Sequence, residues 1–125
     1  MKLYKLTISI FLFFIASTAF CKTVTISVTN QSHQAIYISA NNESNLESKI
    51  SVSPSTLSAK PKTQIITFEK INDHDAYFEI YFGKFLNDEN CTFAYDFSHG
   101  ISLAECPDIS YAISADGQSI TLKSN

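Results

Sequence analysis

Residues 77–82 read Tyr-Phe-Glu-Ile-Tyr-Phe, and this stretch decides the fold class. Successive side chains of an extended chain point to opposite faces, so Phe78, Ile80 and Phe82 share one face. The residues between them share the other face and include a charged one. An apolar side opposite a mixed side is typical of a strand that covers a hydrophobic core on one face. The stretch therefore predicts a half-buried β-strand.

The same two-residue period recurs along most of the chain. It is found at 23–29, 35–40, 64–69, 91–97 and 109–114, with shorter apolar pairs at Ile50 and Val52, Ile101 and Leu103, and Ile120 and Leu122. Turn-forming residues separate these segments every 8 to 12 residues or so, and no long segment has a helical period. The sequence predicts an all-β protein, an antiparallel β-sandwich of Ig-like or jelly-roll-like type with about eight short strands. A small closed barrel is the alternative.

Three connections carry more specific expectations. We expect segments 23–29 and 35–40 to pair with each other as the first antiparallel pair. Residues 55–61 are interpreted as a loop. Asp116-Gly117 predicts a hairpin, because a tight type I′ turn needs positive φ and these two residues adopt it at low cost.

The first residues have the pattern of an export signal. Lys2 and Lys5 precede an uncharged, strongly apolar stretch at 6–20 that ends in small residues. This stretch is shorter than the roughly 20 residues that a spanning helix needs. We therefore expect residues 1–21 to be a cleavable signal peptide and residues 22–125 to form one secreted domain, periplasmic or extracellular.

The cysteines bear on the cleavage point. Cleavage before Lys22 removes Cys21 and leaves Cys91 and Cys106, whereas cleavage before Phe20 leaves an odd thiol. Lipid attachment to Cys21 is a third alternative. We expect a disulfide between the remaining pair, which would contribute about 3 kcal/mol by closing its loop.

This disulfide conflicts with a regular hairpin. A tight hairpin that places Cys91 opposite Cys106 turns the apolar side chains at 101–103 to the wrong face. A shift of one residue corrects that face but separates the cysteines. A bulge at Gly100 or near Glu105 would satisfy both needs, so we expect an irregularity there.

The charge balance limits the classes of partner. All nine basic residues are lysines, and 12 residues are acidic. Loss of the predicted signal peptide leaves seven lysines and hence a net charge of −5. This argues against nucleic acid as a partner and gives no support for an anionic membrane surface. The lack of arginine also removes the bidentate group used to bind phosphate and carboxylate.

No residues form a convincing catalytic or metal-binding pattern. Asp73-His74-Asp75 with His33 or His99 is the best metal candidate, but the spacing matches no known ligand set, and a solvated turn is the alternative. The sequence has no Gly-x-Ser-x-Gly motif. We therefore assign no catalytic residue, metal ligand or cofactor, and whether the protein is an enzyme stays open.

Outward-facing aromatic residues are the best candidates for a partner surface. Tyr37, Tyr77 and Tyr81 fall on faces assigned to solvent, and Phe85 precedes a polar turn. If they gather on one face, they form a patch of the kind that binds a partner. The alternative is that a loop or the other sheet covers them.

Residues 24–38, VTISVTNQSHQAIYI, resemble the first strands of several secreted β-sandwich families, of which the aegerolysin-type cytolysins are one. The chain lacks the tryptophans expected in that family, so no site residue is carried over. We expect a non-catalytic binding module for an unknown protein or glycan. The alternatives are a membrane-active, cytolysin-like module, and a small secreted hydrolase or an inhibitor of one that uses residues 53–62 as a protruding loop.

Overall fold

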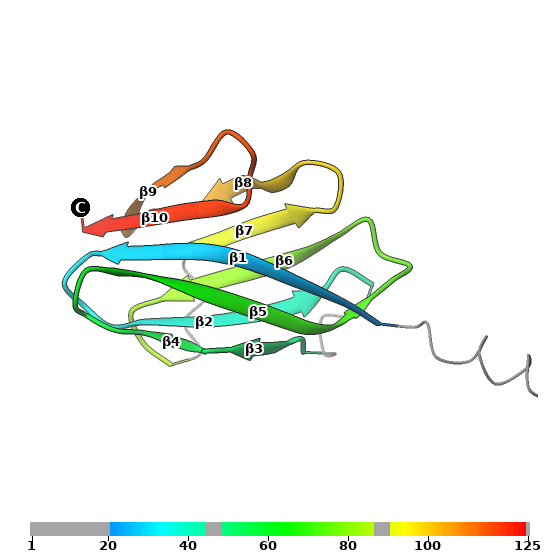
Figure 1. Ribbon diagram of the computed structural model, residues 1–125, viewed down its shortest axis with the longest axis horizontal. Coiled ribbons are helices and arrows are strands. Elements are labelled where there is room, and N and C mark those ends of the chain that lie inside the picture. Colours follow the sequence, from blue (N-terminus) through cyan, green and yellow to red (C-terminus); the bar gives the residue numbers. More distant parts are fainter. Residues whose placement is uncertain (1–20, 45–48, 87–90, 125) are drawn as a thin grey trace, which may run out of the picture.

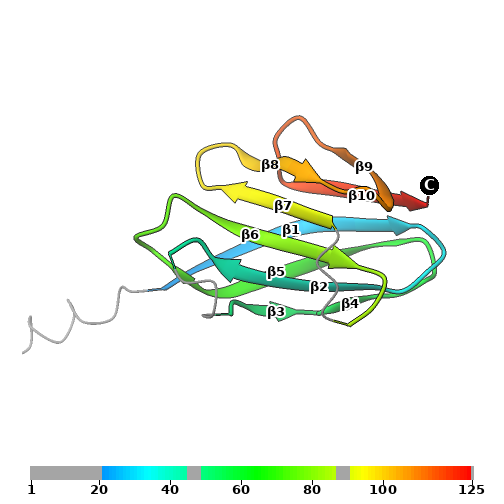
Figure 2. The same cartoon turned by 180° about the vertical axis from the view of Figure 1, so that it is seen from behind.

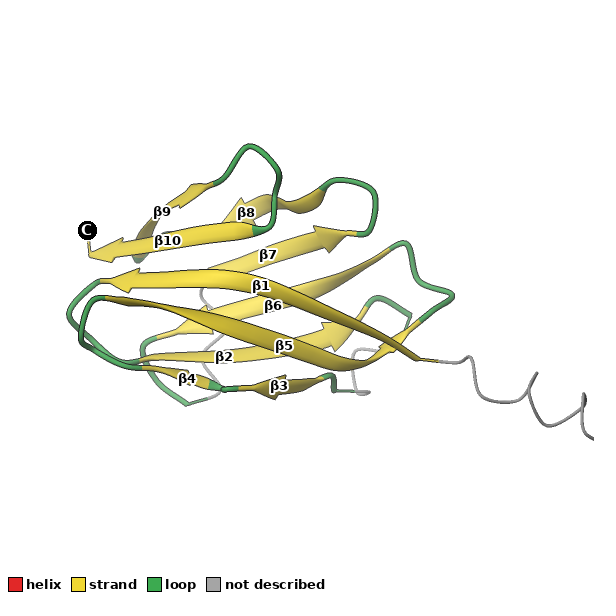
Figure 3. Cartoon of the chain, in the orientation of Figure 1, coloured by secondary structure: helices red, strands yellow, loops and turns green. Residues whose placement is uncertain are grey.

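The structure is a computed structural model and describes residues 21–44, 49–86 and 91–124. These residues contain ten β-strands and no helix (Figure 3). The strands are β1 (Cys21–Gln31), β2 (Ile36–Asn42), β3 (Ser51–Ser53), β4 (Thr56–Leu57), β5 (Lys62–Asn72), β6 (Tyr77–Gly83), β7 (Cys91–Asp96), β8 (Gly100–Glu105), β9 (Ile109–Ile113) and β10 (Ser119–Ser124). The described residues therefore include no helix that could cross a membrane. The predicted signal peptide, apart from Cys21, lies outside them.

The strands form two sheets of five strands that lie face to face (Figures 1 and 2). The first sheet has the order β3-β5-β1-β10-β9, and the second has the order β4-β2-β6-β7-β8. Neighbours are antiparallel except β1 and β10, which are parallel. The predicted β-sandwich is confirmed.

Alternating side chains fill the space between the sheets. In β2 every second residue is buried, as the two-residue period predicts. The largest fully buried side chains are Phe68, Phe78, Phe82, Phe93, Ile36, Leu57, Ile66, Ile71, Ile80, Ile120, Leu122 and Val28. Phe68 of the first sheet contacts Phe78 of the second, with their ring centroids 5.3 Å apart. This contact joins the two layers toward the end of the sandwich where β5 leads into β6.

The expected pairing of 23–29 with 35–40 is wrong. β1 lies between β5 and β10 in the first sheet, whereas β2 pairs with β4 and β6 in the second. Each strand has one apolar face, which points into the core from its own sheet. The chain crosses to the second sheet after β1, so the apolar side of β2 covers the core from the opposite layer.

Asn30 stabilises the crossing from one sheet to the other. Its side chain is 2% exposed, and its Nδ2 donates to the carbonyl oxygens of Gln34 and Ser58 at 2.7 and 2.9 Å. Its Oδ1 accepts from the Ser32 N–H and hydroxyl. The buried amide is therefore fully hydrogen-bonded, which offsets the cost of burying it.

Residues 55–61 are not wholly a loop. β4 pairs with the start of β2, with Leu57 opposite Ile36, and Leu57 is fully buried. Ser53, in β3, pairs with Thr67 of β5. The proposed inhibitor loop at 53–62 is thus held against the sandwich over its first half, because β3 pairs with β5 and β4 pairs with β2.

The β7–β8 hairpin contains the expected disulfide and the expected irregularity. Cys91 is bonded to Cys106. The register shifts between Phe93 and Ala94, where Leu103 is the extra residue and has a φ of 35°. The bulge lies at Leu103, between the two positions considered from the sequence. It keeps the cysteines opposite each other and turns Ile101 into the core.

The predicted β9–β10 hairpin is confirmed, but its turn is not of type I′. The Ser114 N–H donates to the Ser119 carbonyl, and residues 115–118 form the loop. Gly117 has a φ of 71°, whereas Asp116 is not among the residues with positive φ. A four-residue loop needs only one such residue, and here glycine supplies it.

Two glycines bring the turns of opposite sheets together. The Ile101 N–H, next to Gly100, donates to the Gly117 carbonyl at 2.8 Å. A Cβ atom on Gly117 would overlap the His99 carbonyl, and one on Gly100 would overlap Gly117 itself. The lack of side chains at both positions therefore allows a direct backbone contact between the β7–β8 and β9–β10 turns.

Gly117→Ala should lower the free energy of unfolding by about 2 to 4 kcal/mol, since it combines an unfavourable φ with a backbone clash. Urea denaturation measures the change. Ala115→Ser, at an exposed position of the same loop, is the control and should change stability by less than about 0.5 kcal/mol. Equal stabilities of the two variants would show that the turns do not pack together.

Candidate functional site

A groove of about 470 Å³ runs over the outer face of the second sheet, the face turned away from the core. β6, β7 and β8 form it. The lining residues are Tyr77, Glu79, Thr92, Phe93, Ala94, Asp96, Ser102, Leu103, Ala104 and Glu105. We call it the outer groove.

Small side chains and the bulge explain why the sheet is hollowed at this point. Ala94 lies between Glu79 of β6 and Ser102 of β8 in the strand register. The short side chains of Ala94 and Ser102 leave the middle of the row empty. The bulged Leu103 rises beside them with 84% of its surface exposed. The same irregularity that allows the disulfide thus shapes one wall of the groove.

The outer groove is acidic. Glu79, Asp96 and Glu105 line it from three neighbouring strands or their ends, and no lysine is among the lining residues. In the described parts of the chain, no lysine lies within ion-pair distance of these three carboxylates. Ionised carboxylates accept hydrogen bonds strongly from ammonium and guanidinium groups. The groove therefore offers acceptors for a positively charged ligand.

Asp96 is held in its ionised form. The Ser98 N–H donates to its Oδ1 at 2.7 Å, and His99 Nδ1 lies 3.5 Å from its Oδ2. The hydrogen bond from Ser98 and, less strongly, the interactions with His99 lower the pKa of Asp96. A carboxyl group of this kind acts as a fixed negative charge and not as a proton donor.

The pKa of Tyr77, at one end of the groove, is raised by nearby carboxylates. The charge of Glu43, partial burial, and the charges of Glu79 and Asp75 raise its pKa, in that order. Each of these carboxylates opposes the ionisation of the phenol. Glu43 and Asp75, which are not lining residues, therefore add to the negative charge that acts on Tyr77.

The four aromatic residues expected to form a partner surface do not gather in one patch. Tyr77 lines the outer groove, but Tyr81 is only 6% exposed and donates a hydrogen bond to Glu79. Tyr37 is half-buried on the outer face of β2 and is not among the lining residues. Phe85 is 73% exposed, beyond the end of β6 and away from the groove lining.

Sequence reasoning missed the acidic residues and Leu103. The sequence does contain a pattern that points to this site, because acidic residues occupy outward positions on consecutive strands joined by hairpins. Assigning Glu105 and Leu103 to that face required the position of the bulge, which the sequence left open.

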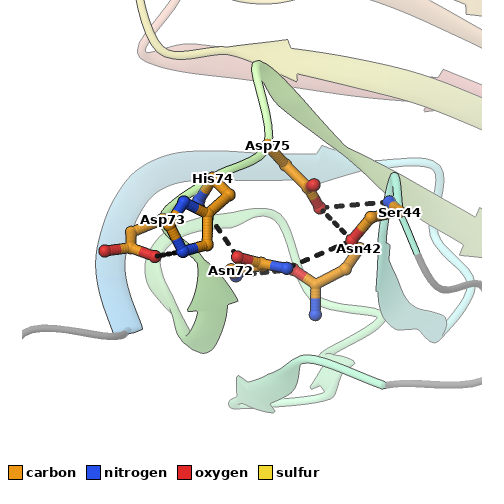
Figure 4. A network of polar contacts seen from close by, with 6 residues as sticks. All are labelled: Asn42, Ser44, Asn72, Asp73, His74 and Asp75. Carbon is orange, nitrogen blue, oxygen red and sulfur yellow. Dashed lines mark hydrogen bonds and ion pairs between the residues drawn. The ribbon is translucent and has the colours of Figure 1, made fainter.

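A polar network ties the end of β2 to the β5–β6 turn (Figure 4). The Asn72 N–H donates to Asn42 Oδ1 at 2.8 Å, and Asn72 Nδ2 donates to Ser44 Oγ at 3.1 Å. Asp75 Oδ2 accepts from both the N–H and the hydroxyl of Ser44, each at 3.1 Å. The network anchors the connection that leads directly into Tyr77 and the outer groove.

The residues considered for a metal site belong to this turn. Asp75 points to Ser44, whereas the His74 ring is 79% exposed and lies 3.6 Å from Asp73 (Figure 4). His33 follows β1, and His99 lies in the β7–β8 turn. Within the described residues, no three His, Cys, Asp or Glu side chains come together in a way that could hold a metal ion.

The sequence matches no family model and no curated protein.

Neutralising Asp96 should remove a pH-dependent contribution to stability. Its pKa is lower in the folded chain, so the contribution is complete above the unfolded value of 3.8 and is lost as the pH falls through the folded value. Denaturation of Asp96→Asn and of the parent between about pH 2 and pH 6 tests this. The difference in unfolding free energy should shrink towards low pH. A constant difference would contradict the assignment.

Proposed function

We propose that the protein acts outside the cytoplasm as a non-catalytic binding module, and that its outer groove holds a positively charged segment of a protein partner. The observation that carries this proposal is the combination of three carboxylates with an exposed leucine in one groove. A lysine- or arginine-containing segment in extended conformation matches both features, since it offers charge for the acids and apolar carbon for Leu103.

The charge of the groove supports a protein segment over a neutral glycan. Glycan sites rely on exposed aromatic rings that stack on sugars, and Tyr77 is the only tyrosine in the lining. Three carboxylates with no lysine among the lining residues instead favour a cationic ligand, because complementary charge speeds association and selects the partner.

The Cys91–Cys106 disulfide supports a location outside the cytoplasm. Disulfides form and persist in oxidising compartments and are rare where thiols are kept reduced. The export signal predicted for residues 1–21 agrees with this location.

A binding role fits the groove better than hydrolysis. Acid–base catalysis by two carboxylates needs one with a raised pKa and one that stays ionised. Asp96, with its lowered pKa, could serve only as the ionised one, and no histidine or cysteine lies among the lining residues. The arrangement thus supplies fixed negative charge and an apolar contact.

A lysine-rich peptide, acetyl-KTKLKTK-amide, is a suitable probe, with acetyl-ETELETE-amide as its acidic counterpart. We expect only the basic peptide to bind in calorimetric titrations, and more weakly as salt increases. Glu105→Gln, which keeps the side-chain shape, should weaken binding by about two- to fivefold, as expected for an exposed ion pair.

Glu69→Gln provides the matched control, because Glu69 is exposed on the outer side of the first sheet. It should leave the affinity unchanged. Equal binding of the acidic and basic peptides, or equal effects of the two substitutions, would contradict the proposal. Binding of a neutral oligosaccharide instead of the basic peptide would favour the glycan alternative.

A further inference from the structure

The sandwich ends in four edge strands, and edge strands can pair with additional strands. β3 and β9 are the edges of the first sheet, and β4 and β8 are the edges of the second. An edge strand presents backbone donors and acceptors that can bind another chain. Proteins usually protect such edges with short strands, proline, bulges or charge.

Three of the four edges are short or interrupted by a bulge, and β9 is neither. β3 has three residues and is followed by Pro54, while β4 has only two residues. β8 contains the bulge at Leu103 and ends with Glu105. β9 is a regular five-residue strand, Ile-Ser-Tyr-Ala-Ile, with no charge or proline within it, and Pro107 and Asp108 lie just before its first residue.

The register identifies which backbone groups of β9 face outward from the sheet. The Ser114 N–H donates to the Ser119 carbonyl, which marks these two residues as a hydrogen-bonded pair. Hydrogen-bonded pairs alternate along an antiparallel ladder, so Ala112 and Ser110 also bond to β10. The backbone groups of Ile109, Tyr111 and Ile113 then point away from β10, and no other described strand pairs with them.

We propose that this edge of β9 pairs with β9 of a second copy of the chain, in antiparallel orientation, with Tyr111 on the twofold axis. Ile109 then lies opposite Ile113 of the second copy, and Tyr111 lies opposite its own counterpart. Every outward backbone donor of β9 meets an acceptor of the second copy. The two first sheets become one continuous sheet.

The strand is complementary to itself, which selects a second copy as the occupant. In this register Ser110 faces Ala112 of the second copy, so only small side chains meet on the outer side. The inner side brings together Ile109, Tyr111 and Ile113 from both copies, and Tyr111 is 41% exposed in the single chain. β9 carries no charged residue, so two copies do not repel each other there, and no charge favours a foreign strand of opposite sign.

The contact is small, so the pairing is transient. A single pair of five-residue strands buries less than the roughly 1,000 Å² that a stable interface usually exceeds. The dimer is therefore expected at high protein concentration and not in dilute solution.

Two double variants of exposed positions separate this pairing from other contacts. Ser110→Lys with Ala112→Lys places lysines opposite each other across the axis. Ser110→Lys with Ala112→Glu places each lysine opposite a glutamate and is the matched control. Both variants lose the same parent side chains, and thermal unfolding verifies that both are folded.

Sedimentation velocity of the disulfide-bonded mature chain, from about 10 µM to 1 mM, measures self-association. We expect the parent and the lysine–glutamate variant to dimerise, and the two-lysine variant to dimerise about tenfold more weakly, even though it lowers the net negative charge. A parent chain that stays monomeric to 1 mM overturns the proposal. So does a two-lysine variant that dimerises as the parent does.

Discussion

The contact between Phe68 and Phe78 is the interaction on which the two-layer structure depends. Each ring is fully buried, and each comes from a different sheet. Phe78 also stacks on Tyr95, with ring centroids 5.2 Å apart, so the aromatic cluster extends into β7. Burying one such ring stabilises the fold by about 1.5 to 3 kcal/mol. A sheet with one apolar face is not stable alone in water. The Phe68–Phe78 contact is a place where the apolar faces of the two sheets pack together.

Much of the fold follows from alternation, which a single sequence displays directly. The strand at 77–82 and the partner of Cys91 could both be predicted, because side-chain parity and cysteine number are local or countable properties. Pairing could not be predicted in the same way. β1 and β2 are adjacent in the chain but lie in opposite sheets, and the Asn30 hydrogen bonds that stabilise this crossing involve Ser58, far along the chain.

The candidate site was less predictable, because it depends on register and not on any one segment. Glu79, Asp96 and Glu105 are spread over 27 positions of the chain and meet only when β6, β7 and β8 are aligned. The bulge at Leu103 then decides which residues of β8 face outward. Tyr81 shows the opposite case, since parity placed it on the outer face and yet it is buried there. The bulge thus connects the disulfide and the shape of the groove in one local feature.

The two sheets pack against each other through Phe68 and Phe78. Nuclear Overhauser contacts between these two rings, in a sample with selectively labelled phenylalanines, test this packing most directly. Ring centroids 5.3 Å apart predict strong cross-peaks between the rings in the folded protein. A folded protein in which the two rings show no cross-peak, while each contacts other residues, would contradict the sandwich described here.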